Sequence, residues 1–476
     1  MGVSELEPAV KSEIDCTFAE QRRYAIHLRG SDYRQRLQVL DRFERVFKAS
    51  YEKLYRAAAA DFSKPETEVD VTEILPILSE LELVRKRLKR WMKPKSVLPA
   101  LMVMGTSSKI LYEPRGVCLV VSPWNYPFNL TFCPMILAVA AGNTVVIKPS
   151  EMTPNMSAVI EEIIKGTFEQ KEVAVFQGDS ATAGYLTSLP FDHIFFTGSP
   201  EVGRHVMAAA AKNLASVTLE LGGKSPVIVE RSANIEKSAD TIVFGKFSNN
   251  GQTCIAPDYL YVESSIKEEF VAALKRSILR LYGTTEQLAA NPDYCRVVNS
   301  RHFIRLQRLL DNAIENGAEV VHGGLHISES RLIEPTLLMG VSDELDIMQE
   351  EIFGPLLPLI EYHDLDQVID DINARPKPLA LYVFTAKRAV SEKIIRQTSA
   401  GDTCVNQIAL HYMHPHLPFG GVNNSGLGKT GGRWGFEAFS HQRSVLEDKF
   451  SGTALLYPPY APRVKGLIKK AMRYLF

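Results

Sequence analysis

Long apolar runs, low-complexity tracts and blocks of like charge are lacking in this chain of 476 residues. No stretch approaches the roughly 18 consecutive apolar residues of a membrane-spanning helix, so we expect no transmembrane segment. The first residues also lack the basic start and apolar stretch of a secretory signal. These absences favour a cytoplasmic protein, and a composition of 45% hydrophobic and 23% charged residues is typical of a globular one.

An excess of charge of either sign is lacking too. There are 54 Lys and Arg residues against 55 Asp and Glu residues, and the formal net charge is -1. Such a chain creates no field that attracts nucleic acid, so we expect no nucleic-acid partner. The length suffices for roughly two or three domains, each with a core of its own.

Cysteine is scarce, with six residues and no C-x-x-C pair. Sparse thiols in a long chain argue for a reducing compartment, against a disulfide framework and against a zinc site, and we expect no metal. Three cysteines lie in apolar segments and are interpreted as core packing: Cys118, Cys133 and Cys404. The others are Cys16, Cys254 and Cys295.

The first hundred residues predict helices. Apolar residues recur at helical spacing from Leu37 to Leu54, and a further helical pattern runs to about Trp91. From Gly116 onward, near-continuous apolar runs alternate with helical stretches at Pro154–Lys165 and Pro200–Lys212. Such runs predict strands buried on both faces, at 116–123, 144–150, 173–178, 193–198 and 216–223. This alternation is typical of an open parallel sheet of the Rossmann type.

A second series of strands and helices begins after Ser225, with strands at 225–230 and 259–264, and continues to about Val405. We expect it to form a second α/β domain. The two glycines that follow Leu221 mark the crossover between the two domains.

Several polar residues come directly after the predicted strands, where open α/β sheets bind ligands. Lys148 and Glu151 follow the strand at 144–150 and suit the hydroxyl groups of a ribose, although a solvated loop pair is an equal alternative. Thr197, Gly198 and Ser199 precede a helix, and a glycine turn at a helix N-terminus can bind a phosphate. The spacing from Gly198 to Gly203 differs from the dinucleotide fingerprint, so a plain strand-to-helix turn is the simpler interpretation of this segment alone.

Two further residues at strand ends suit catalysis. Asn125, held in the turn "PWNYP", is a neutral donor for a developing oxyanion, or else a turn-forming asparagine. Glu220 ends an apolar strand ahead of two glycines. Desolvation there would raise its pKa toward that of a useful base, and a structural carboxylate bonded to loop N–H groups is the competing interpretation.

Cys254 lies in the stretch "NNGQTCIAP" without a neighbouring charge or histidine. A thiol must become a thiolate to act as a nucleophile, whereas a lone cysteine is more often a packing residue. This stretch alone does not decide between them.

Together these segments resemble the NAD(P)-dependent aldehyde dehydrogenase family. "PWNYP", "VIKPSE", "FTGS", "ELGGKSP", "GQTCIAPDY", "EEIFGPLLP" and "LPFGGVNNSGLG" match in order and spacing along nearly the whole chain. "TCIAPDY", the short N-terminus, "FSHQRSVL" and "YPPY" are most similar to the class 3 or fatty aldehyde branch, in which dimers are usual. The chain departs from that branch at Asn423, Thr430 and Gly431, near the segment that usually adjoins the substrate tunnel.

The resemblance implies a role for each matching residue. Cys254 would be the nucleophile, Glu220 the general base, and Asn125 the oxyanion donor together with the backbone N–H of Cys254. The other implied roles concern the cofactor: Lys148 and Glu151 at the adenine ribose, Thr197, Gly198, Ser199 and Gly203 at the pyrophosphate, Leu221 and Gly222 at the nicotinamide, Glu351 at its ribose, and Phe353 beside its ring.

The implied reaction oxidises medium- or long-chain aliphatic aldehydes, or aromatic ones, to carboxylic acids through a thiohemiacetal and a thioester. Cofactor charge and backbone N–H groups would lower the pKa of the thiol, and Glu220 would take its proton. Glu151 favours NAD by accepting from a ribose 2′-hydroxyl, while Lys148 leaves NADP open. The alternatives are a CoA-acylating or semialdehyde-specific relative, and a catalytically silent binding or structural protein.

For architecture we expect a nucleotide-binding domain over 1–93 and 111–221 and a catalytic α/β domain over 222–417. A small β oligomerisation arm over 94–110 and 418–450 would make a homodimer. The tail 451–476 carries an apolar helical face: Val464, Leu467, Ile468, Ala471, Met472, Leu475 and Phe476. Basic residues beside this face favour a helix on a membrane surface, and docking on the protein itself or across a dimer is an equal alternative.

Overall fold

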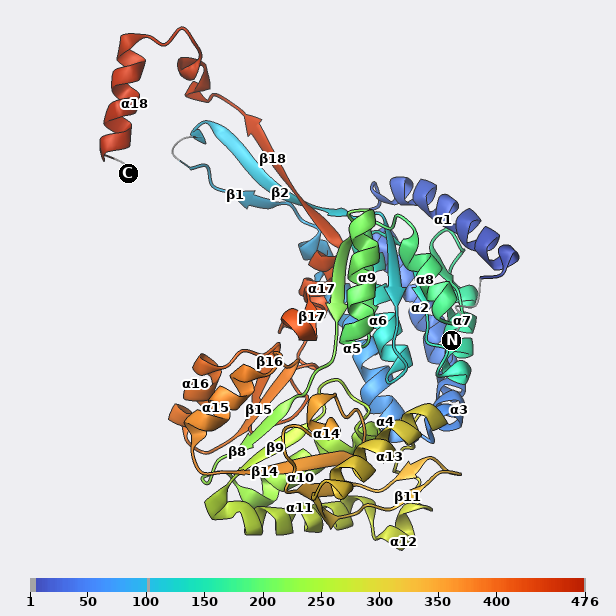
Figure 1. The fold of residues 1–476 in the computed structure, drawn as a ribbon. Helices are drawn as coiled ribbons and strands as arrows, with labels where there is room; N and C mark the ends of the chain where they lie inside the picture. The colour runs from blue at the N-terminus through green and yellow to red at the C-terminus, as the bar shows by residue number, and fades with distance from the viewer. Residues whose placement is uncertain (1–5, 101–102, 475–476) are drawn as a thin grey trace.

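The computed structural model describes residues 6–100 and 103–474. Within these residues, strands form a six-stranded first sheet, a seven-stranded second sheet, a three-stranded third sheet and a two-stranded hairpin (Figure 1). Helices flank the first and second sheets, which confirms the predicted α/β class.

The first sheet contains the strands predicted between Gly116 and Gly223. Its order is β17-β7-β6-β3-β4-β5. The parallel strands are β3 (Val117–Val121), β4 (Thr144–Lys148), β5 (Val173–Val175), β6 (His193–Thr197) and β7 (Ser216–Glu220). The intervening helices are α6 (Pro127–Ala141), α7 (Pro154–Thr167), α8 (Ser180–Ser188) and α9 (Pro200–Lys212). The expected Rossmann-type arrangement is therefore confirmed.

The N-terminal helices are α1 (Pro8–Leu28), α2 (Tyr33–Ala49), α3 (Tyr51–Phe62) and α5 (Leu75–Trp91). Helix α1 contacts β3 and β4 of this sheet, whereas α2, α3 and α5 form an outer layer on α6 and α7. The apolar residues predicted at helical spacing belong to α2 and α3, which meet at Ser50. They pack on α6, for example through Phe43 and Phe132, whose ring centroids are 5.1 Å apart. A short helix α4 (Glu66–Val69) and a π-helical turn η1 (Asp70–Ile74) connect α3 to α5.

The second sheet has the order β10-β13-β14-β9-β8-β15-β16. Its strands are β8 (Pro226–Val229), β9 (Tyr259–Glu263), β10 (Glu319–His322), β13 (Thr336–Met339), β14 (Leu356–Tyr362), β15 (Ala380–Phe384) and β16 (Asp402–Val405). All neighbours are parallel except β10, which pairs antiparallel with β13. The chain crosses from the first sheet to the second between Glu220 and Pro226, at the predicted pair of glycines.

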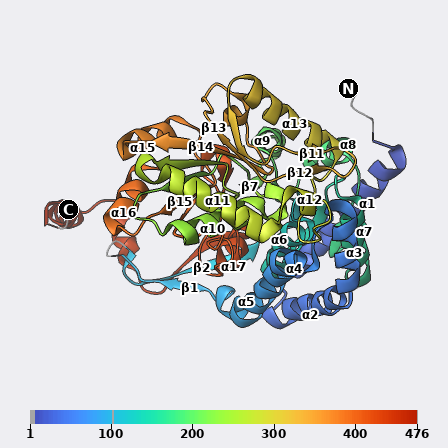
Figure 2. The same cartoon turned by 90° about the horizontal axis from the view of Figure 1, so that it is seen from below.

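Five helices of eight residues or more accompany the second sheet in the described chain: α10 (Ile235–Phe247), α11 (Lys267–Tyr282), α13 (Ser300–Glu315), α15 (Leu365–Ala374) and α16 (Arg388–Gln397). Figure 2 shows them around this sheet from below.

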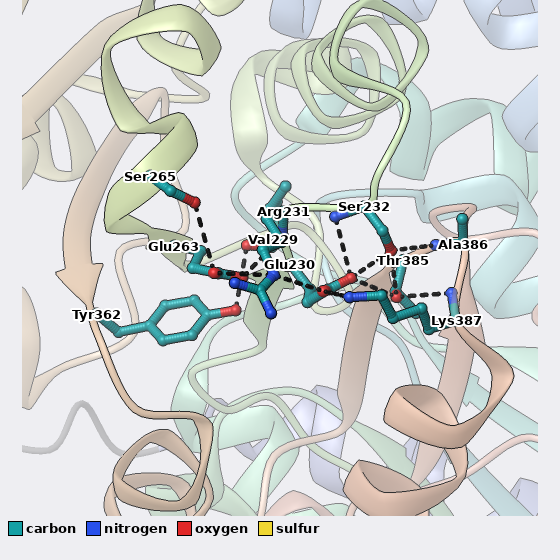
Figure 3. Close-up of polar contacts among 10 residues, drawn as sticks. All are labelled: Val229, Glu230, Arg231, Ser232, Glu263, Ser265, Tyr362, Thr385, Ala386 and Lys387. Atoms are coloured by element: carbon teal, nitrogen blue, oxygen red, sulfur yellow. Dashed lines mark hydrogen bonds and ion pairs between the residues drawn. The ribbon is translucent and has the colours of Figure 1, made fainter.

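A hydrogen-bond network occupies the carboxyl edge of the second sheet (Figure 3). The buried carboxylate of Glu230 follows β8 and accepts from Thr385 Oγ1 at 2.8 Å and from Lys387 Nζ at 2.9 Å. The hydroxyl and the backbone N–H of Ser232 donate to the same carboxylate. Burial raises the pKa of Glu230, but these donors outweigh it and lower the pKa to about 2. The polar groups at this edge are thus engaged with one another.

The third sheet projects from the body of the molecule (Figure 1). It consists of β1 (Lys95–Val97), β2 (Thr106–Pro114) and β18 (Ser440–Asp448). β18 pairs antiparallel with the whole of β2, from Ser440 opposite Pro114 to Asp448 opposite Thr106. Both segments that were predicted to supply an arm contribute strands to this sheet.

Part of the segment 418–450 differs from the expected arm. β17 (Gly426–Leu427) pairs with β7 at the edge of the first sheet. The following helix α17 (Gly432–Ala438) packs on α5, where the ring centroids of Phe436 and Trp91 are 5.5 Å apart. Two backbone pairs and an aromatic contact therefore hold this stretch on the body, and only β18 extends into the third sheet.

The C-terminal helix α18 (Pro462–Tyr474) stands apart from the body in both views (Figures 1 and 2). None of its described residues is buried, and Leu467 and Met472 are 65% and 66% exposed. The alternative that it docks on its own chain is therefore wrong for these residues. Leu475 and Phe476 of the predicted apolar face lie outside the described residues. In the described chain, no helix is both long and apolar enough to cross a bilayer.

Candidate active site

The predicted site residues lie at the carboxyl edge of the first sheet and at the amino edge of the second sheet. Those of the first sheet follow the carboxyl ends of β3, β4, β6 and β7. Cys254 and Glu351 instead precede β9 and β14, which are adjacent and parallel. The carboxyl edge of the first sheet thus contributes to the same site as the amino edge of the second.

The loop that carries Cys254 has an unusual backbone. Asn249 and Asn250 have φ angles of 51° and 56° and precede Gly251 at 71°, so three successive residues are left-handed. Such a conformation costs on the order of 1 kcal/mol or more per non-glycine residue and persists only where the surroundings hold it. Side-chain hydrogen bonds do so here: Asn250 Nδ2 donates to Cys295 O at 3.2 Å, and Gln252 Nε2 donates to Arg296 O at 3.1 Å.

The turn that carries Asn125 lies against this loop. Asn249 Nδ2 donates to the backbone oxygen of Asn125 at 3.0 Å. The hydroxyls of Tyr126 and Thr253 are 2.6 Å apart, and Thr253 directly precedes Cys254. Asn125 is buried, and within the described chain its side-chain amide has no hydrogen-bond partner. The amide is therefore available to a ligand beside Cys254.

The Cys254 sulfur lies in an acidic environment. The residue is half-buried. Burial raises the pKa of its thiol to about 12, the carboxylates of Glu351 and Glu220 add to this rise, and the backbone N–H groups of Cys254 and Ile255 oppose it. The expected lowering by backbone N–H groups is thus present but outweighed. In the protein alone the thiol stays protonated at neutral pH, and a base must remove its proton.

Glu220 ends β7 and is one of the carboxylates that raise the pKa of the Cys254 thiol. It is buried, and neither carboxyl oxygen has a hydrogen-bond partner among the described residues. The alternative of a structural carboxylate bonded to loop N–H groups is therefore wrong. Burial raises the pKa of Glu220 well above its ordinary value, Lys429 opposes this and Asp402 adds to it. A buried carboxyl group without partners is poised to bind a water molecule or a proton.

The residues predicted for the adenine ribose lie together at the end of β4. Lys148 Nζ is 2.6 Å from Glu151 Oε2, and the Lys148 side chain is 4% exposed while that of Glu151 is 45% exposed. The buried stem fixes the ammonium group, and the exposed carboxylate faces solvent. The alternative of a fully solvated pair does not describe Lys148.

The turn predicted for the pyrophosphate joins β6 to α9. Ser199 is the N-cap of α9 and accepts from Val202 N at 3.3 Å. Thr197 lies opposite Glu220 in the strand register, and Gly198 N donates to Glu220 O at 3.0 Å. The phosphate-binding turn therefore adjoins the strand that ends in the candidate base. Gly203 packs closely, because a Cβ atom there would lie 2.6 Å from a methyl group of Leu221.

Glu351 closes the other side of the site. A Cβ atom added to Gly222 would lie 2.6 Å from Glu351 Oε1 and nearer still to Oε2. Burial raises the pKa of Glu351 to about 8, Asp258 adds to this, and the N–H of Gly223 opposes it. The carboxyl group thus lies on the glycine backbone that the sequence predicts beneath the nicotinamide.

Phe353 reaches the same region with a left-handed φ of 48°. Its ring centroid is 5.1 Å from that of Trp124, next to Asn125. The structure therefore brings residues from five separate motifs together. A glycine cradle under a carboxyl group and a helix N-terminus beside it fit the ribose and phosphate groups of a dinucleotide.

Some residues of the site were not singled out from the sequence. Thr253 contacts Tyr126 across 127 residues of sequence. Lys429 and Asp402 both act on the pKa of Glu220, and Asp258 acts on that of Glu351. No local pattern marks these residues, because only the fold makes them neighbours.

Comparison with known proteins decides the family. The profile of the aldehyde dehydrogenase family matches residues 3–445. The chain belongs to the aldehyde dehydrogenase family. The dimeric NADP-preferring aldehyde dehydrogenase of Rattus norvegicus is 42% identical over 86% of this chain and 89% of its own length. Aldehyde dehydrogenase family 3 member A2 of Mus musculus is 39% identical over 90% of this chain and 88% of its own.

A solved structure, the substrate-bound state of Staphylococcus aureus AldH, superposes with a TM-score of 0.91 at 40% identity over 97% of this chain and 99% of its own. These findings confirm the resemblance to the aldehyde dehydrogenase family and its class 3 branch. This aldehyde dehydrogenase is accordingly an NAD(P)-dependent oxidoreductase.

Proposed function

We propose that this enzyme oxidises medium- or long-chain aliphatic aldehydes, or aromatic ones, to carboxylic acids through a thioester at Cys254. The observation that carries the proposal is a half-buried thiol whose pKa responds to Glu220, a buried carboxyl group whose two oxygens have no partner among the described residues. This pairing suits a nucleophile and its base.

In the first half of the reaction, the Cys254 sulfur bonds to the aldehyde carbon and the thiol proton passes to Glu220. The carbonyl oxygen becomes an alkoxide, which the Asn125 amide and the backbone N–H of Cys254 stabilise. NAD(P), when bound, supplies the hydride acceptor for oxidation of the aldehyde carbon. Residues that suit its binding are Lys148, Glu151, Thr197, Gly198, Ser199, Gly203, Leu221, Gly222, Glu351 and Phe353.

In the second half, Glu220 releases its proton to solvent and activates a water molecule. The water attacks the thioester carbon, the C–S bond breaks, and Cys254 leaves as a thiol with the carboxylic acid as product. The raised pKa of Glu220 supports this role, because a carboxylate with a raised pKa is a stronger base and takes a proton from water more readily.

We propose NAD as the preferred cofactor, with NADP also accepted. The exposed Glu151 carboxylate favours a ribose 2′-hydroxyl over a 2′-phosphate, while the neighbouring Lys148 ammonium group tempers that repulsion. The rat relative is named as NADP-preferring, which supports acceptance of both.

We further propose a homodimer built through the third sheet. A three-stranded sheet that projects from the body with exposed residues on both faces is marginal by itself. Leu446 on β18 is 57% exposed, and β18 is an edge strand. The rat relative is named as dimeric. Sedimentation at micromolar concentration should therefore give twice the chain mass of 53.1 kDa, and a value at the chain mass itself contradicts the dimer.

For the remaining organisation we propose the division expected above, with nucleotide binding in 1–93 and 111–221 and catalysis in 222–417. The tail 451–476 would contact a membrane surface through α18, whose apolar residues are exposed beside several lysines and arginines. Vesicles of phosphatidylcholine and phosphatidylserine should float the whole chain but not a chain lacking 463–476. Equal flotation contradicts this contact.

The reaction itself is tested by NADH formation with hexanal, with and without CoA. We expect formation without CoA and no acceleration by it, since Glu220 supplies the base that hydrolysis needs. Dependence on CoA favours the acylating alternative, and no turnover with any aldehyde favours the silent one. Cys254→Ser should abolish NADH formation, and full activity in that variant excludes the covalent scheme.

A further inference from the structure

A positive charge is enclosed next to the two loops that carry Asn125 and Cys254. Lys64 follows α3, and its side chain is 0% exposed, as is that of Glu73 on the π-helical turn η1. Lys64 Nζ and Glu73 Oε1 are 3.3 Å apart. Removal of a charge from water costs several kcal/mol by itself, so this ammonium group depends on its neighbours.

Glu73 connects Lys64 to the loop that carries Asn125. Glu73 Oε2 accepts from the backbone N–H of Asn129 at 2.9 Å, in the first turn of α6. Asn129 Nδ2 in turn donates to Thr72 O at 3.0 Å. A carboxylate at a helix N-terminus is favourable, and this one fixes the helix that begins two residues after Asn125.

Glu68, on the neighbouring helix α4, contacts a residue that holds the loop of Cys254. Burial raises the pKa of Glu68, whereas Lys64, the Cys295 thiol and the backbone N–H of Asn249 lower it. Cys295 Sγ donates to Glu68 Oε2 at 3.5 Å. Asn249 begins the left-handed stretch that leads to Cys254, and Cys295 accepts from Asn250 in the same stretch.

A third contact runs through an aromatic ring. Lys64 Nζ lies 4.2 Å from the ring centroid of Tyr126, within the range of a cation–π interaction. The hydroxyl of the same ring contacts Thr253. One ammonium group therefore touches the Asn125 turn at Tyr126 and reaches the Cys254 loop through the hydroxyl of that residue.

A contribution to folding stability alone does not explain the buried ammonium group of Lys64. Apolar residues of similar volume often replace buried ion pairs without loss of stability, and π-helical turns occur frequently at functional sites. We infer that Lys64 is a positioning residue for this reaction: its enclosed ammonium group, shared by Glu73 and the Tyr126 ring, holds the Asn125 and Cys254 loops at their working separation. The inference rests on the proposed function.

The test compares Lys64→Met with Lys64→Arg and with Lys53→Met. Lys53 is the matched control, because it forms an exposed ion pair with Glu162 on the same helical layer. We expect Lys64→Met to lower kcat about 100-fold, as a displacement of about 1 Å does, with NAD affinity within about twofold of the wild type. Lys64→Arg should recover part of kcat, and Lys53→Met should keep all of it.

A second readout needs no turnover. Iodoacetamide labelling of Cys254 in the cofactor-free protein should be at least about threefold faster in Lys64→Met, because the loosened loop exposes the sulfur. A folded Lys64→Met protein with unchanged kcat and unchanged labelling overturns the inference, as does a parallel loss of kcat and NAD affinity that Lys64→Arg does not restore. If Lys64→Met fails to fold, Glu73→Gln, which removes the ion pair of Lys64, decides by the same two readouts. If the wild-type protein shows no dehydrogenase activity but Lys64→Met still labels faster than the wild type, the positioning role stands and the proposed function is rejected.

Discussion

The carboxyl group of Glu351 lies directly on the backbone of Gly222. A Cβ atom at Gly222 would be 2.6 Å from Glu351 Oε1. We expect Gly222→Ala to displace this carboxyl group and to weaken NAD binding by about tenfold or more in a fluorescence titration, since one or more hydrogen bonds to the ribose would be lost. Gly184→Ala is the control, because a Cβ atom there meets nothing within 4 Å. Unchanged affinity in Gly222→Ala contradicts a ribose site at Glu351.

The thiol of Cys254 should react slowly at neutral pH in the absence of cofactor. Burial and the carboxylates of Glu351 and Glu220 raise its pKa to about 12, so the thiolate fraction keeps increasing with pH well beyond neutrality. Iodoacetamide labelling followed by peptide mass spectrometry should show a rate that still rises between about pH 8 and pH 10. Glu220→Gln removes a negative charge and should raise the rate at a fixed pH. A plateau near pH 8 is the contrary result.

Cofactor choice should depend on Glu151. Its exposed carboxylate neighbours Lys148 at 2.6 Å. Glu151→Gln removes the repulsion of a 2′-phosphate and frees the ammonium group, so kcat/KM with NADP should rise about three- to tenfold relative to NAD. The measurement is a pair of initial-rate titrations with one aldehyde. If the ratio of kcat/KM with NADP to kcat/KM with NAD does not change, the 2′ position of the adenine ribose does not lie at Glu151.

The hydroxyl contact between Tyr126 and Thr253 should support the alignment of the two loops. Tyr126→Phe keeps the ring over Lys64 but loses the 2.6 Å contact, so we expect kcat to fall about fivefold to tenfold with little change in thermal stability. Thr253→Val should behave alike, and the double variant should be no worse than either single one. Additive losses in the double variant exclude a shared interaction.

Glu230 should make the free energy of unfolding depend on pH in the acidic range. Hydrogen bonds and Lys387 lower its pKa from 4.5 to about 2 despite burial. Its contribution is present above pH 4.5 and disappears as the pH falls toward 2. Glu230→Gln should therefore lower the free energy of unfolding at pH 7 by about 2 kcal/mol, a deficit that shrinks below pH 4.5. Urea unfolding measures it, with the exposed Glu329→Gln as control. A deficit that does not vary with pH contradicts this dependence.

Much of the fold follows from local patterns. The strands β3 to β9 lie within the apolar runs that the sequence presents, because strands buried on both faces need continuous apolar residues. The placement of Lys148, Asn125, Ser199 and Glu220 at one sheet edge follows from the geometry of parallel strands. Secondary structure and strand topology were therefore sufficient to predict these parts of the site.

Other features depend on packing that no local pattern encodes. Lys64 and Glu73 are nine residues apart, and each would be expected on a solvated helix face until the fold encloses them. The acidic environment of Cys254 arises from Glu351, which is distant in sequence. The attachment of Gly426–Leu427 to β7 likewise required the three-dimensional arrangement, since two residues carry no periodicity.

The covalent scheme is tested most directly by the mass of Glu220→Gln after reaction with hexanal and NAD. Loss of the base should slow the first half of the reaction, since solvent must then take the thiol proton, and should stop the second. A hexanoyl group should therefore accumulate on the peptide that contains Cys254, with a matching burst of NADH. The same burst without any acyl group on Cys254, or steady turnover by this variant, would contradict the scheme.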